Sequence, residues 1–309
     1  MAGFAYLFPG QGAQAIGMGR TFYDRFAESR DIYKRANTHL GFDIAALCFE
    51  GPAEELFQTD KCQVALFVTA IAAFAAFHVK NVSRKPVGVA GLSLGELTAL
   101  AVADALRFTD ALYLVQARGD LMADCAAHHK GGMLAVVGLS LEVIEAVCVE
   151  SGTVAANFNS SEQVVLSGSL DAIDRAQALA KQKGAKRAMK LEVSGAFHSP
   201  LMQQAAMKFK EVLSKVEIRP PIFPVISNVT GEMVKDPDQI RELLVKQIVS
   251  PVLWQSSMRS LIQAGATTFL EFPPARILTG LLRRIDSSVS GLAINEPEDF
   301  IQLNVVPDA

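Results

Sequence analysis

The sequence predicts an α/β protein in which a large domain with a parallel sheet is interrupted by a smaller module. Two short apolar runs, Phe4–Phe8 and Pro86–Leu92, each lead through a glycine-containing turn into helical segments, as buried parallel strands do. Between residues 128 and 194 the elements are shorter and follow a different order. With 309 residues, half of them hydrophobic, the chain is long enough for two cores.

The first half of the large domain is expected to alternate strands and helices. Phe4–Phe8 is stopped by Pro9-Gly10 and is therefore interpreted as a strand that ends in a turn. Pro86–Leu92 is interpreted as the next strand. The expected helices are Met18–Leu40, Ala53–Phe57, Val64–Lys80, Gly95–Ala105 and Thr109–Cys125.

The middle of the chain predicts a ferredoxin-like subdomain, His128–Ser194. Its segments alternate as strand, helix, strand, strand, helix, strand. They are Met133–Gly138, Ser140–Ser151, Val154–Ala156, Gln163–Gly168, Leu170–Lys183 and Ala188–Val193. The large domain is then built from 1–127 and 195–309, with further strands expected at Pro220–Ser227 and Thr268–Glu271.

Composition favours a soluble, cytoplasmic protein. The net charge of -3 argues against nucleic acid as the main partner. The four cysteines, Cys48, Cys62, Cys125 and Cys148, form no CxxC pair and are expected to be buried thiols in a reducing compartment. The N-terminus lacks the basic region of a secretory signal. The longest apolar stretch, residues 64–77, is shorter than the roughly 20 residues that span a bilayer, so we expect a buried helix.

Gly91-Leu92-Ser93-Leu94-Gly95 matches the G-x-S-x-G pattern of a nucleophile elbow. An apolar strand precedes it and an Ala-rich helix follows, which is the context that the elbow requires. The small glycines permit a sharp turn that exposes the serine. The pattern therefore predicts a nucleophilic Ser93 in an α/β-hydrolase-like domain, although a turn serine would also fit these five residues.

A nucleophilic serine needs a base, and His198 is the best placed of the five histidines. It lies in Gly195-Ala196-Phe197-His198-Ser199-Pro200, just before a helix, where a loop residue can point into a site. The other four are predicted to lie in helical stretches or, as His128 and His129, in a loop. Neither this pair nor the cysteines predict a metal site, and no cofactor is expected.

Several ordered motifs, together with this elbow, resemble malonyl-CoA:acyl-carrier-protein transacylases of fatty acid synthesis. The resemblance covers the chain from Phe4 to about Pro297. The motifs are Phe8-Pro9-Gly10-Gln11-Gly12-Ala13-Gln14, Gly91-Leu92-Ser93-Leu94-Gly95-Glu96, Gln116-Ala117-Arg118-Gly119, Asn157-Phe158-Asn159-Ser160, Ala196-Phe197-His198-Ser199 and Gln247-Ile248-Val249-Ser250-Pro251-Val252-Leu253-Trp254.

The resemblance implies a ping-pong transfer of malonyl from malonyl-CoA to acyl carrier protein through a malonyl-serine intermediate. Ser93 and His198 would be the catalytic pair, and the backbone amides of Gln11 and Leu94 the oxyanion hole. A backbone carbonyl near Gln247 would orient the histidine. Gly10–Ala15 also fits a dinucleotide-binding pattern, but Asp31–His39 looks helical where the second strand should end.

Arg118 lies inside a predicted apolar helix, where an unpaired charge costs desolvation. The residues alone leave two interpretations open, a structural ion pair or a substrate carboxylate held by two bonds. The resemblance favours the malonyl carboxylate. It also implies Gln63, Asn159 and Phe197 as further substrate-binding residues.

Some positions depart from the usual family pattern. Leu92 and Leu97 stand where histidine and tyrosine are frequent, which predicts a more apolar pocket rim. Phe272-Pro273-Pro274-Ala275 replaces a Gly-Pro-Gly turn. All the catalytic groups remain, so the alternative function is a thioester hydrolase or esterase on the same elbow rather than a non-catalytic module.

The expected partners are malonyl-CoA and an acyl carrier protein, without nucleic acid or membrane, and we expect a monomer. Acyl carrier proteins are acidic, so positive charge is needed near the cleft. The candidates are Lys181, Lys183, Lys186, Arg187 and Lys190, although an ordinary solvated helix face would have the same composition.

Overall fold

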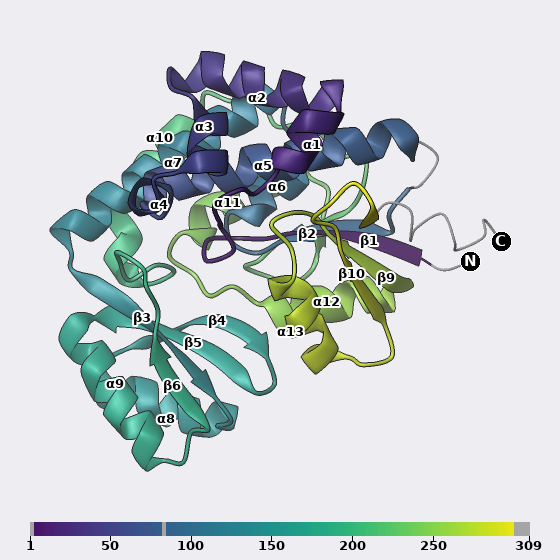
Figure 1. Cartoon of the computed structure of the whole chain (residues 1–309). Helices are drawn as coiled ribbons and strands as arrows, with labels where there is room; N and C mark the ends of the chain where they lie inside the picture. The colour runs from purple at the N-terminus through teal and green to yellow at the C-terminus, as the bar shows by residue number, and fades with distance from the viewer. Residues whose placement is uncertain (1–2, 82–84, 300–309) are drawn as a thin grey trace.

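The structure, a computed structural model, describes residues 3–81 and 85–299. The predicted domain ranges also include residues 1–2, 82–84 and 300–309, which lie outside the described residues. Two β-sheets organise the described chain, one mainly parallel and one antiparallel (Figure 1). The mixed α/β class with two separate sheets is therefore confirmed.

The larger sheet has six strands in the order β10-β9-β1-β2-β7-β8. All neighbouring strands are parallel except β7 and β8. The strands are β1 Gly3–Phe8, β2 Gly88–Gly91, β7 Val225–Ile226, β8 Met233–Val234, β9 Ala266–Glu271 and β10 Ser290–Ala293.

Strand β1 is apolar throughout because both of its faces are covered. Tyr6 and Phe8 contribute to the core beneath the N-terminal helices, whereas Ala5 and Leu7 contribute to a second core with α12 and α13. A strand in a parallel sheet that has helices on both faces is expected to be apolar along its whole length. The core therefore lies on both sides of β1 and β2, and it holds their carboxyl ends rigidly.

Helices flank this sheet on both sides (Figure 1). Helix α5 is long and apolar enough to cross a membrane by length and composition, yet 78% of its apolar window is buried inside the protein, which is the buried helix expected from the sequence. The helices of this unit are α1 Arg20–Arg25, α2 Ala27–Leu40, α3 Ile44–Glu50, α4 Ala53–Leu56, α5 Thr59–Lys80, α6 Gly95–Val102, α7 Phe108–His128, the short 3₁₀ helix Pro200–Met202, α10 Gln203–Leu213, α11 Pro237–Gln247, α12 Trp254–Gln263 and α13 Ile277–Ile285.

The smaller sheet is antiparallel, with the order β4-β5-β3-β6. Two helices, α8 and α9, close its core on one face, as the lower part of Figure 1 shows. In chain order the elements are β3 Gly131–Val137, α8 Leu141–Ser151, β4 Val154–Ser160, β5 Gln163–Ser169, α9 Leu170–Gln182 and β6 Arg187–Lys190. The predicted alternation of strands and helices is confirmed.

Several predicted boundaries were wrong for identifiable reasons. The helix expected over 18–40 is two helices, because Phe26 has an extended backbone between them. The strand expected over 220–227 is reduced to β7, since Pro220, Pro221 and Pro224 offer no N–H to a sheet. His128 ends α7 rather than lying in a loop, and Cys148 is only partly buried.

Candidate active site

Ser93 lies at a sharp turn between β2 and α6. Its φ of 53° is in the left-handed region, which is uncommon for a residue other than glycine. The flanking glycines permit the turn, because a Cβ on Gly91 would lie 1.9 Å from the Gly95 carbonyl carbon, and a Cβ on Gly95 would lie 2.2 Å from the Phe8 oxygen. The sequence therefore folds into an elbow that presents the serine at the end of a strand.

The Ser93 hydroxyl forms a hydrogen bond with the base that the sequence suggested. Ser93 Oγ lies 2.8 Å from His198 Nε2, and His198 Nδ1 lies 2.7 Å from the backbone oxygen of Gln247. Since a carbonyl only accepts, the proton of a neutral His198 resides on Nδ1 and leaves Nε2 free to accept from serine. The hydroxyl, imidazole and carbonyl thus form a chain without a carboxylate.

Arg118 is buried and converges on the same hydroxyl. Its Nη1 donates to Gln63 Oε1 at 2.7 Å, and its Nη2 donates to Gln247 Oε1 and Ser93 Oγ, both at 2.9 Å. Among the described residues no carboxylate forms an ion pair with this guanidinium within 4.0 Å. A direct structural ion pair is therefore absent from this part of the chain, but the buried Glu96, which Gln247 links to Arg118, acts on it electrostatically and favours its charged form.

Burial shifts the titration of the three ionisable groups around Ser93. Desolvation, together with the Arg118 charge, lowers the pKa of His198 to about 4. Desolvation also lowers the pKa of Arg118 to about 10 and raises the pKa of Glu96 to about 7. His198 is consequently neutral at physiological pH, as a general base must be, and Arg118 remains charged.

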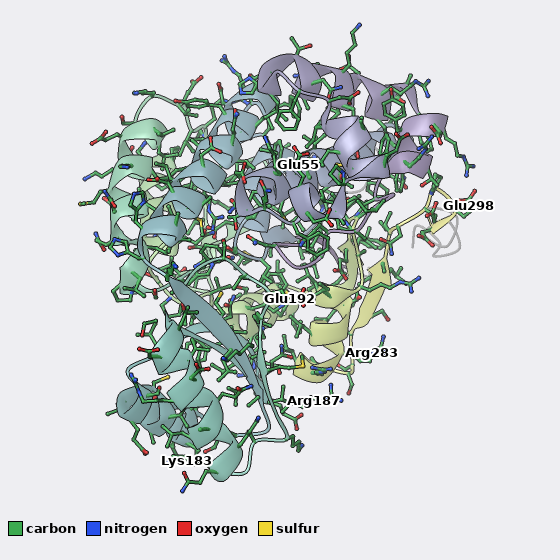
Figure 2. The ribbon with its side chains drawn as sticks, turned by 60° about the vertical axis from the view of Figure 1, so that its left-hand side comes forward. Glu55, Lys183, Arg187, Glu192, Arg283 and Glu298 are labelled. Carbon is green, nitrogen blue, oxygen red and sulfur yellow. The ribbon has the colours of Figure 1, made fainter. Side chains whose placement is uncertain are left out.

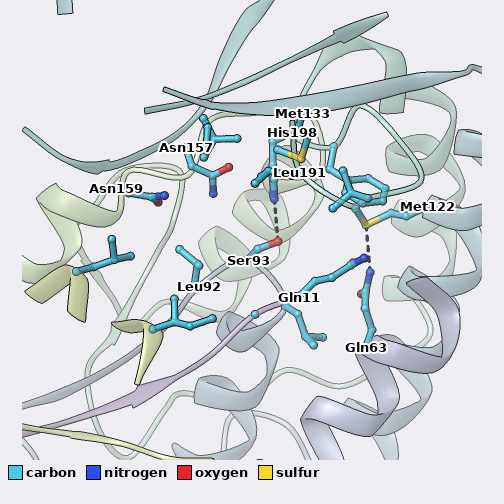
Figure 3. A pocket seen from close by; sticks show the side chains of 18 of the residues that line it. Gln11, Gln63, Leu92, Ser93, Met122, Met133, Asn157, Asn159, Leu191 and His198 are labelled. Carbon is cyan, nitrogen blue, oxygen red and sulfur yellow. Dashed lines mark hydrogen bonds between the residues drawn. The ribbon is translucent and has the colours of Figure 1, made fainter. Parts of the chain in front are cut away.

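A pocket of about 200 Å³ opens above Ser93 between the two sheets (Figure 3). The larger unit contributes Gly10, Leu92, Ser93, Ile277 and Leu281, among others, to its lining. The smaller unit contributes Met133, Ala135, Asn157, Asn159, Gln163 and Val165. A polar, positively charged end at Arg118 and an apolar wall fit a short acyl group that ends in an anion.

All the residues proposed from the sequence border this pocket or touch those that do. Gln63, Asn159 and Phe197 line it. Within the described structure, the buried Asn159 Oδ1 has no hydrogen-bond partner and is free to accept from a ligand. Gln11 and Leu94 line the pocket beside Ser93, and the side chain of Gln247 bonds Arg118.

The departures from the family pattern have unequal consequences. Leu92 lines the pocket, as expected, and the segment 272–275 leads directly into Ile277, which also lines it. Leu97 is only 1% exposed and belongs to the core, away from the pocket. The prediction that Leu97 makes the rim more apolar was wrong, because its position on α6 faces the helical core.

Two residues that sequence reasoning missed support the elbow. Asn228 Oδ1 accepts from the Ser93 amide at 2.6 Å, and Asn228 Nδ2 donates to the Gly91 oxygen at 2.8 Å. Glu96 Oε2 accepts from Gln247 Nε2 at 2.7 Å and from the Asn228 amide at 3.1 Å. The sequence signals for Glu96 were its place at the end of the elbow motif and its single charge inside the otherwise uncharged segment 95–102.

The basic residues proposed for a carrier surface are mostly paired. Lys183 contacts Glu150 at 2.8 Å, Lys186 contacts Glu162 at 3.8 Å, and Lys190 pairs with Asp174. Lys181 and Arg187 have no such partner among the described residues. Figure 2 shows Lys183 at the far end of the smaller unit and Arg187 closer to the larger unit. Only part of the predicted cluster therefore offers unpaired charge.

No group of three or more His, Cys, Asp or Glu side chains within the described ranges could hold a metal ion. The groups that line this site are a serine, a neutral histidine, a buried arginine and backbone amides. Such a set suits acyl transfer through an activated hydroxyl.

Comparison with known proteins agrees with this chemistry. Residues 5–296 match the acyl transferase domain. The chain is 40% identical over 303 residues to the malonyl CoA-acyl carrier protein transacylase of Bacillus subtilis (strain 168), covering 96% of this chain and 95% of that protein.

Solved structures are equally similar. An acyl carrier protein S-malonyltransferase from Vibrio cholerae is 36% identical, with a TM-score of 0.93 over 98% of this chain and 100% of that one. A malonyl-transacylase solved in complex with its type II PKS acyl-carrier protein is 37% identical, with a TM-score of 0.94 over 97% of this chain and 98% of that one. The chain therefore belongs to the acyl transferase family that includes the malonyl CoA-acyl carrier protein transacylases.

Proposed function

We propose that this acyltransferase moves a malonyl group from malonyl-CoA to the phosphopantetheine thiol of an acyl carrier protein, by a ping-pong mechanism through malonyl-Ser93. The observation that carries the proposal is the buried Arg118, which lacks an ion-pair partner in the described chain and donates to the nucleophile itself. The names of the relatives support the same substrate and acceptor.

In the first half-reaction Ser93 Oγ attacks the thioester carbonyl while His198 Nε2 accepts the hydroxyl proton. The carbonyl oxygen becomes an oxyanion, for which the backbone amides of Gln11 and Leu94 are the proposed donors. When the tetrahedral intermediate collapses, its C–S bond breaks and His198 returns the proton to the CoA thiolate. The Gln247 carbonyl stabilises the imidazolium that forms between these steps, since it accepts from Nδ1.

The second half-reaction reverses the first with another thiol. His198 deprotonates the phosphopantetheine thiol, whose sulfur attacks the malonyl-serine ester, and the proton returns to Ser93 Oγ. No net oxidation occurs and neither step needs a cofactor.

Arg118 is proposed to bind the malonyl carboxylate. An arginine can hold both carboxylate oxygens, and in this site Gln63 and Gln247 accept from its nitrogens and keep the guanidinium plane fixed. The carboxylate would take the place that the serine hydroxyl occupies against Nη2. An acetyl group lacks this carboxylate and would leave the buried cation with only the more remote charge of Glu96, which reaches it through Gln247.

Two further residues are proposed to select the substrate. Phe197, next to the base and only 5% exposed, should crowd a methyl branch on the α-carbon and so favour malonyl over methylmalonyl. One methyl in an apolar pocket is worth about 1–3 kcal/mol, so this selection is finite. Asn159 would accept a hydrogen bond from the pantetheine part of the donor.

The finer architectural assignments are also proposals. The strand order β4-β5-β3-β6 supports a ferredoxin-like subdomain at 128–194, and the elbow supports an α/β-hydrolase-like domain from 1–127 and 195–309. We further propose that the enzyme acts as a cytoplasmic monomer.

A hydrolase on the same elbow is the alternative, and one assay separates the two. The protein is incubated with malonyl-CoA, with and without holo acyl carrier protein, and malonyl-carrier and free malonate are quantified together. The proposal predicts that malonyl-carrier forms much faster than malonate. Equal malonate release with and without the carrier, and no malonyl-carrier, would establish the hydrolase instead.

A further inference from the structure

Glu96 is a buried carboxylate beside the reacting groups that the mechanism above does not use. It lies in the first turn of α6, three residues after Ser93, and is 2% exposed. Its Oε2 accepts two hydrogen bonds, from the side chain of Gln247 and from the amide of Asn228. Burying a carboxylate with so little contact with solvent costs free energy, so we expect this carboxylate to have a compensating role.

The contacts of Gln247 show what this carboxylate holds. Gln247 Oε1 accepts from Arg118, whereas Nε2 donates to Glu96 Oε2 and to the Ser93 backbone oxygen at 2.9 Å. If the amide flipped, its NH₂ would face the guanidinium and its oxygen would face two acceptors. Such a flip is disfavoured on both sides, so the acceptors Glu96 and Ser93 O fix the orientation.

We infer that Glu96 is a positioning residue that locks the Gln247 amide in the orientation that holds Arg118, and so couples the α6 helix to recognition of the acyl carboxylate. This inference rests on the proposed function. Gln247 also supplies the carbonyl that His198 Nδ1 contacts. The same residue therefore links the base, the arginine and the carboxylate of Glu96.

The test is a double-mutant cycle on malonyl transfer. Glu96→Ala should lower kcat/KM for malonyl-CoA at least about tenfold, or 1.4 kcal/mol, and should reduce acetyl transfer less. Glu96→Gln keeps an acceptor and should retain activity within about threefold of wild type. In a Gln247→Ala background, Glu96→Ala should add little further loss, because the residue acts through that side chain.

The melting temperature of each variant controls for a purely structural effect. The pKa of Glu96 is raised to about 7, chiefly by desolvation, so the stability that this group contributes below its unfolded pKa of about 4.3 is lost as pH rises to about 7. Glu96→Gln should therefore unfold at a higher temperature than wild type at pH 8.5. If Glu96→Ala lost malonyl and acetyl transfer equally and only in proportion to a lower melting temperature, Glu96 would be a structural residue.

Glu271 provides a matched control. It is also fully buried, but its oxygens accept from the amides of Leu278 and Thr279 and cap α13. Glu271→Gln should lower the melting temperature while leaving the ratio of malonyl to acetyl transfer unchanged.

Provided that the wild-type protein forms malonyl-carrier, three results would overturn the inference. They are an unchanged malonyl to acetyl ratio in Glu96→Ala, a full additional loss in the Gln247→Ala background, and failure of both Glu96→Ala and the space-filling Glu96→Met to fold. If wild type itself formed no malonyl-carrier, the proposed function would fail instead, so the two failures are distinguishable.

Discussion

His198 illustrates how burial prepares a side chain for its role. Its pKa is lowered to about 4 by desolvation and by the Arg118 charge, against the opposing effect of the hydrogen bonds that it donates to the Gln247 and Ser250 backbone. The base form is therefore present at neutral pH without a neighbouring carboxylate. The ordinary pKa of histidine, about 6.5, would leave part of the base protonated in mildly acidic conditions.

The first prediction concerns the acid side of the pH–rate profile. The rate of Ser93 acylation by malonyl-CoA should fall with a midpoint near pH 4, because only neutral His198 accepts the proton. Stability should fall as the pH drops from about 6.5 to about 4, since the unfolded histidine binds a proton at about 6.5 and the folded one only near 4. His198→Ala should slow acylation by about 10² or more.

Stopped-flow release of CoA between about pH 3 and pH 8 measures the acylation midpoint and the effect of His198→Ala, and thermal unfolding over the same pH range measures the stability. An acylation midpoint near 6.5 would contradict the low pKa, and a loss below tenfold in His198→Ala would mean that another group activates Ser93.

The second prediction concerns Arg118. Breaking a buried charge pair by removing one partner costs about 3–5 kcal/mol. A difference of about 1.4 kcal/mol corresponds to a tenfold change in kcat/KM. Arg118→Ala should thus reduce malonyl transfer by roughly 10²–10³-fold, while acetyl transfer falls far less or rises. Arg118→Lys should retain only part of the malonyl transfer, since an ammonium group cannot bind both carboxylate oxygens in the bidentate geometry of a guanidinium.

The measurement is kcat/KM for malonyl-CoA and acetyl-CoA in the same preparations, with melting temperatures as the control for folding. Equal losses for both substrates would make Arg118 a structural residue.

At the scale of elements, the elbow depends on glycines that bring β1, β2 and α6 together. Gly95 lies against the backbone of Phe8, with only 2.2 Å between an added Cβ and the Phe8 oxygen. Gly280, by contrast, lies within α13 with no heavy atom within 4 Å of an added Cβ. We therefore expect substitution by alanine to change the stability of the protein in opposite directions at these two glycines.

The third prediction follows from that contrast. Gly95→Ala should destabilise the protein by more than about 2 kcal/mol, because backbone atoms cannot move aside cheaply, and should displace Ser93. Gly280→Ala should stabilise by about 0.5–1 kcal/mol, since alanine is the better helix residue. Urea unfolding of both variants tests this, and similar effects in the two would contradict the close approach of α6 to β1.

The sequence predicted the elements that make the elbow because their signals are local. The apolar run of β1, the glycines around Ser93 and the Ala-rich α6 each suffice to indicate their element. The strands β8 and β10 were missed because they are only two and four residues long, which is too short to show a strand pattern. Asn228 and Glu96 were missed for another reason, since their roles arise only from contacts more than 130 residues away.

At the scale of the whole molecule, the pocket lies where two separately folded sheets meet. The acyl group would sit deep at Ser93, with the apolar wall of the smaller unit above it. A carrier protein must then approach this junction with its phosphopantetheine arm. Positive charge beside the junction should guide an acidic carrier, and this effect should weaken as salt rises.

The fourth prediction tests which cation contributes. Arg187 has no ion-pair partner in the described chain. Its replacement by glutamate should therefore raise the KM for the carrier about three- to tenfold at low salt. Lys183→Glu is the matched control, because it makes the same reversal of charge at a residue that is paired with Glu150 at the far end of the smaller unit. Neither change should alter the KM for malonyl-CoA in the acylation step. An unchanged carrier KM in Arg187→Glu would exclude this side of the molecule.

The central claim, a malonyl-serine intermediate at Ser93, is tested most directly by mass spectrometry. The protein is incubated with malonyl-CoA alone, quenched in acid, weighed intact and digested, with Ser93→Ala in parallel. The account predicts one malonyl group on the peptide that contains Ser93, its loss when holo carrier is added, and no adduct in Ser93→Ala. An adduct on another residue, or wild-type transfer by Ser93→Ala, would contradict it.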